Sequence, residues 1–188
     1  RGVPGFAMKR FTPGQRLFAY AVAGLAGFVD ITGYLHINGY FVSFMTGNTT
    51  LLARDMAEGA HRVAVPALLI AGFVIGVTIG TLVGDRWAAR RKAVVSGMVA
   101  AMLVSAALAR VIDLNPLSLA LLVFAMGALN TVMSGNRANP VGLTYMTGAL
   151  VRTGQLLAER LAGDRSANPL LFAGLWASLL AGALCGAL

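Results

Sequence analysis

Residues 17–37 read LFAYAVAGLAGFVDITGYLHI and contain a single charged side chain, Asp30. At about 1.5 Å per helical residue, this stretch is long enough to cross the ~30 Å hydrocarbon core of a membrane. It is too long for the apolar region of a cleavable signal peptide, and no small-residue cleavage site follows it. The stretch therefore predicts a transmembrane helix.

The whole composition agrees with a membrane protein. Apolar residues make up 57% of the chain, charged residues only 12%, and the mean hydropathy is +0.75, whereas soluble domains carry about 25% charged residues. The net charge of +8 would suggest nucleic acid in a soluble protein, but basic loops beside apolar spans are typical of membrane proteins. The single cysteine, Cys185, excludes an intrachain disulfide and a cysteine metal cluster. We predict lipid as the environment, and no nucleic acid, metal or cofactor.

Five stretches predict full spans: 17–37, 63–84, 93–112, 117–134 and 170–188. Two more segments, 40–59 (YFVSFMTGNTTLLARDMAEG) and 141–163 (VGLTYMTGALVRTGQLLAERLAG), are interrupted by polar residues. Each opens with about six apolar or β-branched residues, breaks at Met-Thr-Gly, and continues as an amphipathic helix that ends in Gly. Neither is predicted to cross the membrane fully.

An internal repeat relates the two halves of the chain. Gly27-Phe28-Val29-Asp30 precedes Gly127-Ala128-Leu129-Asn130 by 100 positions, and the Met-Thr-Gly at 45–47 precedes that at 146–148 by 101. Glycines at 72, 80 and 84 precede those at 174, 182 and 186 by 102 positions. We predict two repeat units, residues 1–112 and 113–188. The second unit has no counterpart of span 93–112, so a sixth, final span is expected to be missing from this chain.

Charge predicts that the two units are inverted. If the N-terminus is cytoplasmic and neither broken segment crosses, the basic loops all lie in the cytoplasm and the charges of the outer loops cancel. If 40–59 crossed fully, the basic loop at 85–92 would lie outside, against the positive-inside bias. Each broken segment is therefore predicted to enter the membrane and return. The predicted fold is all-α, with two inverted three-span units that each carry a re-entrant broken helix.

The quoted motifs resemble the YoaK family of bacterial membrane proteins, also called domain of unknown function 1275. The resemblance rests on residues 27–30, 44–49, 144–148 and Asn130, and it covers nearly the whole chain. It implies a six-span protein of the bacterial inner membrane, and it implies no substrate.

Asp30 is the one acid inside a predicted span, where an ionised carboxylate costs about 2.5–3.5 kcal/mol. Helical spacing places Gly27, Gly33 and Tyr34 beside it, which leaves room for a partner backbone or for water. One interpretation is a proton- or cation-responsive group that lines a polar path. The other is a structural acid that caps a neighbouring helix. Its repeat partner Asn130 keeps the polarity without the charge.

The two Met-Thr-Gly breaks are the second candidate feature. Thr46, Asn48 and Thr147 are suitable N-cap residues for the helices that follow, and Gly47 and Gly148 lie within the breaks. Buried helix N-termini present unpaired amide groups, and paired broken helices form binding sites in many transporters. Alternatively, both breaks are packing kinks without a ligand.

Small residues at a spacing of four predict close helix packing, either between the two units or between protomers. They form one stripe in span 63–84 and a second in span 170–188: Gly72, Gly76, Gly80, Gly84, and Gly174, Ser178, Gly182, Gly186.

Together these features predict a transporter or channel for a small polar solute, and no enzyme. A non-transporting scaffold or sensor is the alternative. The predicted site lies where Thr46, Gly47 and Asn48 meet Thr147 and Gly148 near the midplane, with Asp30 a few ångströms away. Asp30 would change protonation as access alternates.

The charge pattern leads to a test of topology. Reporter domains fused near Arg91 and near Arg160 should both read as cytoplasmic, because both positions lie in basic loops. Opposite sides for the two fusions would rule out the inverted repeat.

Overall fold

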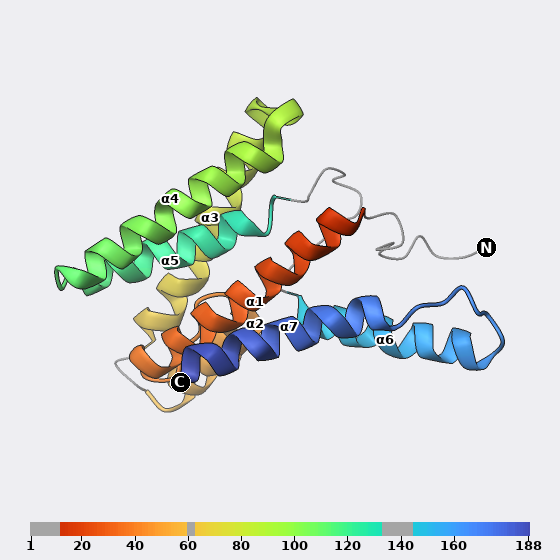
Figure 1. The fold of residues 1–188 in the computed structure, drawn as a ribbon. Helices are drawn as coiled ribbons and strands as arrows, with labels where there is room; N and C mark the ends of the chain where they lie inside the picture. Colours follow the sequence, from red (N-terminus) through yellow and green to blue (C-terminus); the bar gives the residue numbers. More distant parts are fainter. Residues whose placement is uncertain (1–11, 60–62, 133–144) are drawn as a thin grey trace. The chain divides into compact units, whose positions relative to one another are not determined.

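We describe residues 12–59, 63–132 and 145–188 in a computed structural model, and these residues form helices joined by turns and short irregular segments, without strands (Figure 1). Residues 133–134, at the end of one predicted span, and 141–144, at the start of the second broken segment, lie outside the described residues. The elements in chain order are α1 (Pro13–His36), α2 (Met45–Ala57), α3 (Ala64–Arg86), η2 (Ala88–Arg90), α4 (Arg91–Val111), α5 (Asn115–Leu129), α6 (Met146–Leu161) and α7 (Leu170–Ala187).

Four helical stretches in the described part of the chain are long and apolar enough to cross a membrane: α1, α3, η2 with α4, and α7. The predicted span 117–134 is represented by α5, which has 15 residues and is therefore about 22 Å long. It ends where Asn130 follows Leu129, because the Asn130 side chain donates to the Met126 carbonyl at 3.0 Å. The next amide, that of Thr131, bonds to Ala128 in a tighter turn.

Residue contacts divide the chain into two compact units, residues 1–28 with 143–188, and residues 29–142. The first unit contains α6, α7 and the start of α1. The second unit contains the end of α1 together with α2, α3, α4 and α5. These units differ from the sequence halves 1–112 and 113–188. The reason is that α1 packs against α7, from the other half of the sequence.

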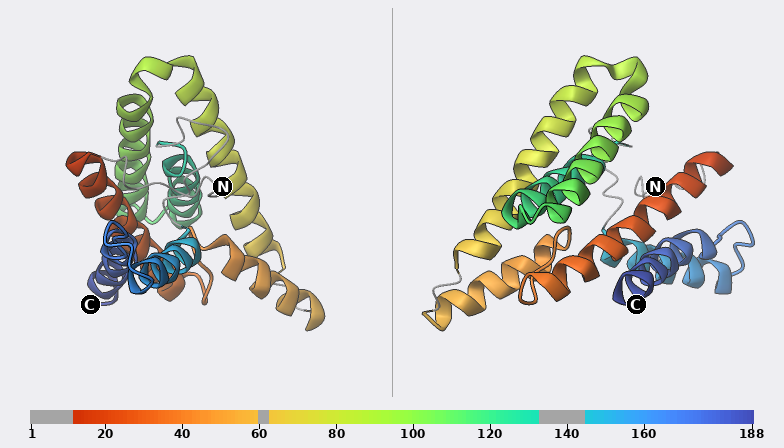
Figure 2. Two further views of the ribbon diagram at one scale, coloured as in Figure 1. Left: turned by 90° about the vertical axis from the view of Figure 1, so that its right-hand side faces the viewer. Right: turned by 60° about the vertical axis from the view of Figure 1, so that its left-hand side comes forward.

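In the unit of residues 29–142, α3, α4 and α5 lie side by side (Figure 2). Gly72, Gly76 and Gly80 of the α3 stripe face α5: a Cβ on Gly76 would overlap the backbone of Phe124, and one on Gly80 would lie 2.9 Å from the Cα of Ala128. Later stripe residues contact later α5 residues, so the two helices run parallel. On the other side of α5, the Ser118 hydroxyl donates to the Ala106 carbonyl of α4 at 2.8 Å.

In the other unit, α1 and α7 pack in the same way. A Cβ on Gly182 would overlap the backbone of Gly24, and one on Gly27 would overlap that of Leu179. The Tyr20 hydroxyl donates to the Leu171 carbonyl at 3.1 Å. Early α1 residues thus meet early α7 residues, so this pair is also parallel. Helix α6 packs against α7 as well.

The two parallel contacts involve corresponding glycines. Gly27 of α1 and Gly127 of α5 are 100 positions apart, and each has the backbone of a stripe-bearing helix against it. Gly80 of α3 and Gly182 of α7 are 102 positions apart, and each faces the backbone of the partner helix. One type of helix contact therefore occurs twice in the chain.

The stripe leads to a test of packing. Replacing Gly76 or Gly80 with Leu should hold α3 and α5 apart, because backbone occupies the space a side chain needs. We expect a loss of about 2 kcal/mol or more, measured as a lower melting temperature in detergent. Gly97 of α4 is the matched control, since a Cβ there meets no atom within 4 Å, and Gly97→Leu should melt like the parent. Unchanged melting for Gly76→Leu and Gly80→Leu would show that the stripe faces lipid.

Candidate functional site

The first candidate feature is the break between α1 and α2. Helix α1 ends at His36, and the chain turns through Asn38 (φ 53°) and Gly39 (φ 90°), two residue types that tolerate the left-handed region. Residues 40–44 are then irregular before α2 begins at Met45. The backbone groups of residues 41–43 lie outside the helices, so other groups must satisfy them.

Asp30 of α1 satisfies several of them. Its Oδ1 accepts from the amides of Val42 and Ser43 at 2.9 and 2.6 Å, and its Oδ2 accepts from the Ser43 hydroxyl at 2.7 Å. Gly33, one turn further along α1, has no side chain where the Val42 side chain packs. Asp30 therefore holds the irregular backbone just before a helix N-terminus. This geometry agrees with a structural role for Asp30 and leaves its titration as a proposal.

Asn48 of α2 holds the same segment from the other side. Its Oδ1 accepts from the Phe41 amide at 2.9 Å, and its Nδ2 donates to the Phe41 carbonyl at 2.7 Å. The Asn48 side chain is fully buried. It thus replaces both hydrogen bonds that Phe41 would make in regular structure.

A third contact involves residues that the sequence analysis did not single out. The Tyr40 hydroxyl donates to Oδ2 of Asp55, and Arg54 donates to Oδ1 from Nε at 3.0 Å and from Nη2 at 2.7 Å. Asp55 is buried, with 1% of its surface exposed. By its hydrogen bond first and its charge second, Asp55 raises the pKa of the Arg54 guanidinium. The spacing of seven between Asn48 and Asp55 was the available signal, because it places both on one face of a helix.

We call Asp30, Asn48 and Asp55 the backbone clamp. Asp30 and Asn48 bond the main chain of residues 41–43, and Asp55 bonds the Tyr40 side chain. At the repeat shift of 101, the counterparts of Asn48 and Asp55 are Ala149 and Leu156, both buried and apolar. These two clamp positions are therefore polar in the first half of the sequence only.

The starts of α2 and α6 have the same local geometry. Their N-cap residues are aromatic, Phe44 (φ −85°, ψ 73°) and Tyr145 (φ −82°, ψ 76°), and neither helix has a side-chain cap. A Cβ on Gly47 or Gly148 would overlap the ring that precedes it.

The N-cap role predicted for Thr46, Asn48 and Thr147 is therefore wrong. Both helices begin at the methionine, so the two threonines lie inside the first turn and Asn48 bonds to Phe41 instead. The aromatic ring packed on the glycine fixes this earlier start.

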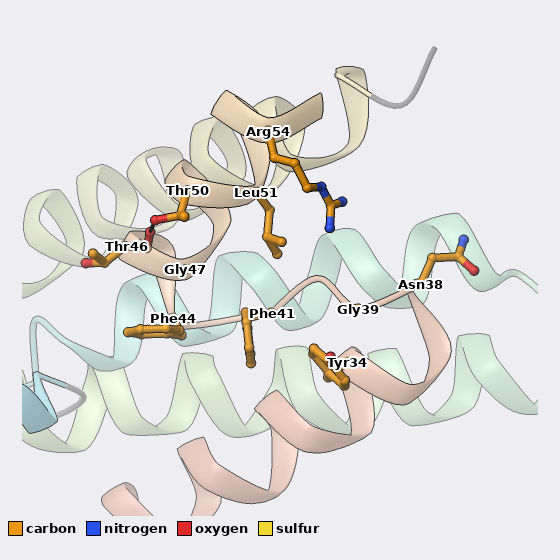
Figure 3. Close-up of a pocket in the computed structure, with 10 residues that line it drawn as sticks. All are labelled: Tyr34, Asn38, Gly39, Phe41, Phe44, Thr46, Gly47, Thr50, Leu51 and Arg54. Carbon is orange, nitrogen blue, oxygen red and sulfur yellow. Dashed lines mark hydrogen bonds between the residues drawn. The ribbon is translucent and has the colours of Figure 1, made fainter. Parts of the chain in front are cut away.

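A groove of about 470 Å³ lies between the break and α2 (Figure 3). One side carries the rings of Tyr34, Phe41 and Phe44, whose neighbouring centroids are 5.1 and 5.2 Å apart. The opposite side is formed by α2 residues: Thr46, Gly47, Thr50, Leu51 and Arg54.

The predicted site residues thus fall into separate groups. Thr46 and Gly47 line the groove. Asp30 and Asn48 are not among the lining residues, since their polar atoms bond the break. Asn130 lies at the end of α5, and Thr147 and Gly148 lie in the first turn of α6, in the other compact unit. The meeting of the two breaks stays a prediction.

The apolar helices, with polar side chains holding an irregular segment between two of them, define a multi-pass helical membrane protein. The family model described as "Protein of unknown function (DUF1275)" matches residues 18–188. The chain is also 37% identical over 180 residues to the UPF0700 transmembrane protein RA0705 of Rhizobium meliloti. The matched residues make up 95% of this chain and 77% of that protein. The chain therefore belongs to the DUF1275 family, which confirms the resemblance inferred from the motifs. No solved structure matches it.

The clamp leads to a test of stability. Asn48→Ala should leave the partly buried amide and carbonyl of Phe41 without these partners, at a cost of about 2 kcal/mol or more. The measurements are melting in detergent and hydrogen exchange of residues 40–44, which should accelerate. Thr49→Ala is the control, because Thr49 is exposed and donates only to its own helix. Equal stability and exchange in both variants would contradict the clamp.

Proposed function

We propose that this protein is a small-solute transporter or channel, and that the groove beside the first break forms part of its solute site. The observation that carries the proposal is the break itself: three polar side chains hold an irregular backbone segment next to a groove. At membrane depth, irregular backbone is tolerated only where protein buries it or where it lines a water-filled cavity. Broken helices of this kind form the solute sites of many transporters.

The twofold occurrence of one helix contact supports the proposed inverted repeat. Helices α1 and α7 run parallel, as do α3 and α5. In the repeat, α1 corresponds to α5 and α3 to α7, so each half contributes one helix to each pair. If the N-terminus is cytoplasmic in the inner membrane, as the basic loops favour, α1 runs outward and α5 inward. The two Met-Thr-Gly breaks would then enter from opposite faces.

Asp30 offers a route to proton linkage. The hydrogen bonds from Val42 and Ser43 are all donated to its carboxylate. A protonated carboxyl would instead present a donor at one oxygen and weaken its hold on Ser43. In this proposal, loosening of the break accompanies a change of access.

Accessibility from the two sides of the membrane tests the proposal against the scaffold alternative. In a Cys185→Ala background, Thr46→Cys places a thiol in the groove, and Val74→Cys places one on an exposed position of α3. A membrane-impermeant maleimide should label Thr46→Cys in right-side-out and in inverted vesicles, and should not label Val74→Cys in either. Labelling of Thr46→Cys from one side only would favour a scaffold or sensor.

The same measurement tests Asp30. The ratio of labelling from the two sides, taken at equal pH on both sides, cancels the reactivity of the thiol itself. That ratio should change between pH 6 and pH 8 in Thr46→Cys and stay constant in Thr46→Cys combined with Asp30→Asn, which keeps an acceptor for the two amides. Parallel behaviour of the two proteins would remove Asp30 from the mechanism.

A further inference from the structure

The lining of the groove includes a cationic side chain and no acidic one. Arg54 is the one charged residue among the ten described residues that line it. Its Nε and Nη2 bond to Asp55, while Nη1 makes no hydrogen bond within the described residues, and half of the side chain is exposed. The Asp55 carboxylate lies behind it, 1% exposed. A ligand in the groove therefore meets the guanidinium and not its counter-ion.

The other wall is aromatic. Tyr34 and Phe41 have ring planes 38° apart, and Phe41 and Phe44 meet edge to face at 86°. Figure 3 shows these three rings along one side, facing Thr46, Thr50 and Arg54 across the groove. Such a wall suits a planar or aliphatic body, and the volume is within the range of small-ligand sites.

From this juxtaposition we propose that the groove binds small monocarboxylates with a planar apolar body, with the carboxylate on Arg54 and the body against the three rings. The inference rests on the proposed function, because it names the solute class of the same site. The start of α2 at Met45 adds partial positive charge at the other end of the groove. Organic cations also bind aromatic faces, but the guanidinium on the opposite wall repels them.

Binding is measured on the full chain in detergent with three probes of similar shape: benzoate, benzamide and benzylammonium. Benzoate should raise the melting temperature in a saturable way, with at least tenfold weaker binding for benzamide and for benzylammonium. Arg54→Gln should weaken benzoate binding at least tenfold, while Arg54→Lys should restore part of it. Preference for benzamide or benzylammonium, or no shift with any probe, would overturn the proposal.

Two neighbouring threonines provide a matched pair that leaves the clamp intact. Thr49 and Thr50 are both exposed, and each donates to the carbonyl four residues earlier, at 2.9 and 3.2 Å. Only Thr50 lines the groove. Thr50→Trp should fill the groove and abolish the benzoate shift, and Thr49→Trp should keep it. Equal behaviour of the two variants would overturn the site.

Two further arms separate this inference from its alternatives. If phosphatidylglycerol reproduces the benzoate shift and Thr50→Trp removes both effects, the ligand is an anionic lipid, and the solute assignment is wrong. Uptake of labelled benzoate into proteoliposomes then tests transport by itself. Binding without uptake would contradict the transport function and support the carboxylate site. Labelling of Thr46→Cys from both sides without benzoate binding would support transport and contradict the carboxylate site.

Discussion

The need to satisfy backbone hydrogen bonds away from water governs this structure. A helix satisfies its backbone groups internally, and the long apolar stretches of the described residues are therefore helical. Residues 40–44 are the exception: Asp30 and Asn48 bond their backbone, and Asp55 bonds the Tyr40 side chain. The buried polar groups Asn48 and Asp55 are therefore explained by the segment they hold. The groove exists because that segment stays irregular beside α2.

Close helix packing is the second constraint, and it depends on missing side chains. Between helices surrounded by lipid there is little hydrophobic driving force, so contact area and close backbone approach determine how strongly they associate. Gly76 against Phe124 and Gly182 against Gly24 allow that approach in the two parallel pairs. Gly33 serves a different purpose, because it makes room for Val42 and so brings the break within reach of Asp30.

The sequence predicted what depends on composition and short spacing. Helical class, apolar spans and family followed from length, hydropathy and motifs, and Gly33 beside Asp30 already indicated room for a backbone. The clamp was harder to foresee, because Tyr40 and Asp55 are 15 positions apart and are separated by the irregular residues 41–44, whose path local sequence patterns do not predict. The N-cap assignment failed for a related reason. Local propensity favours threonine, but the ring of Phe44 packed on Gly47 sets the start of α2 one residue before Thr46.

The position of Asp30 also has a consequence for how the chain is made. During synthesis α1 emerges before the amides that bond Asp30, which follow that residue by 12 and 13 positions. For that interval the helix carries an unpaired carboxylate, which on insertion scales costs about 2.5–3.5 kcal/mol. Stable insertion of α1 is thus coupled to the arrival of residues 42 and 43. We therefore expect α1 and residues 40–44 to insert into the bilayer together.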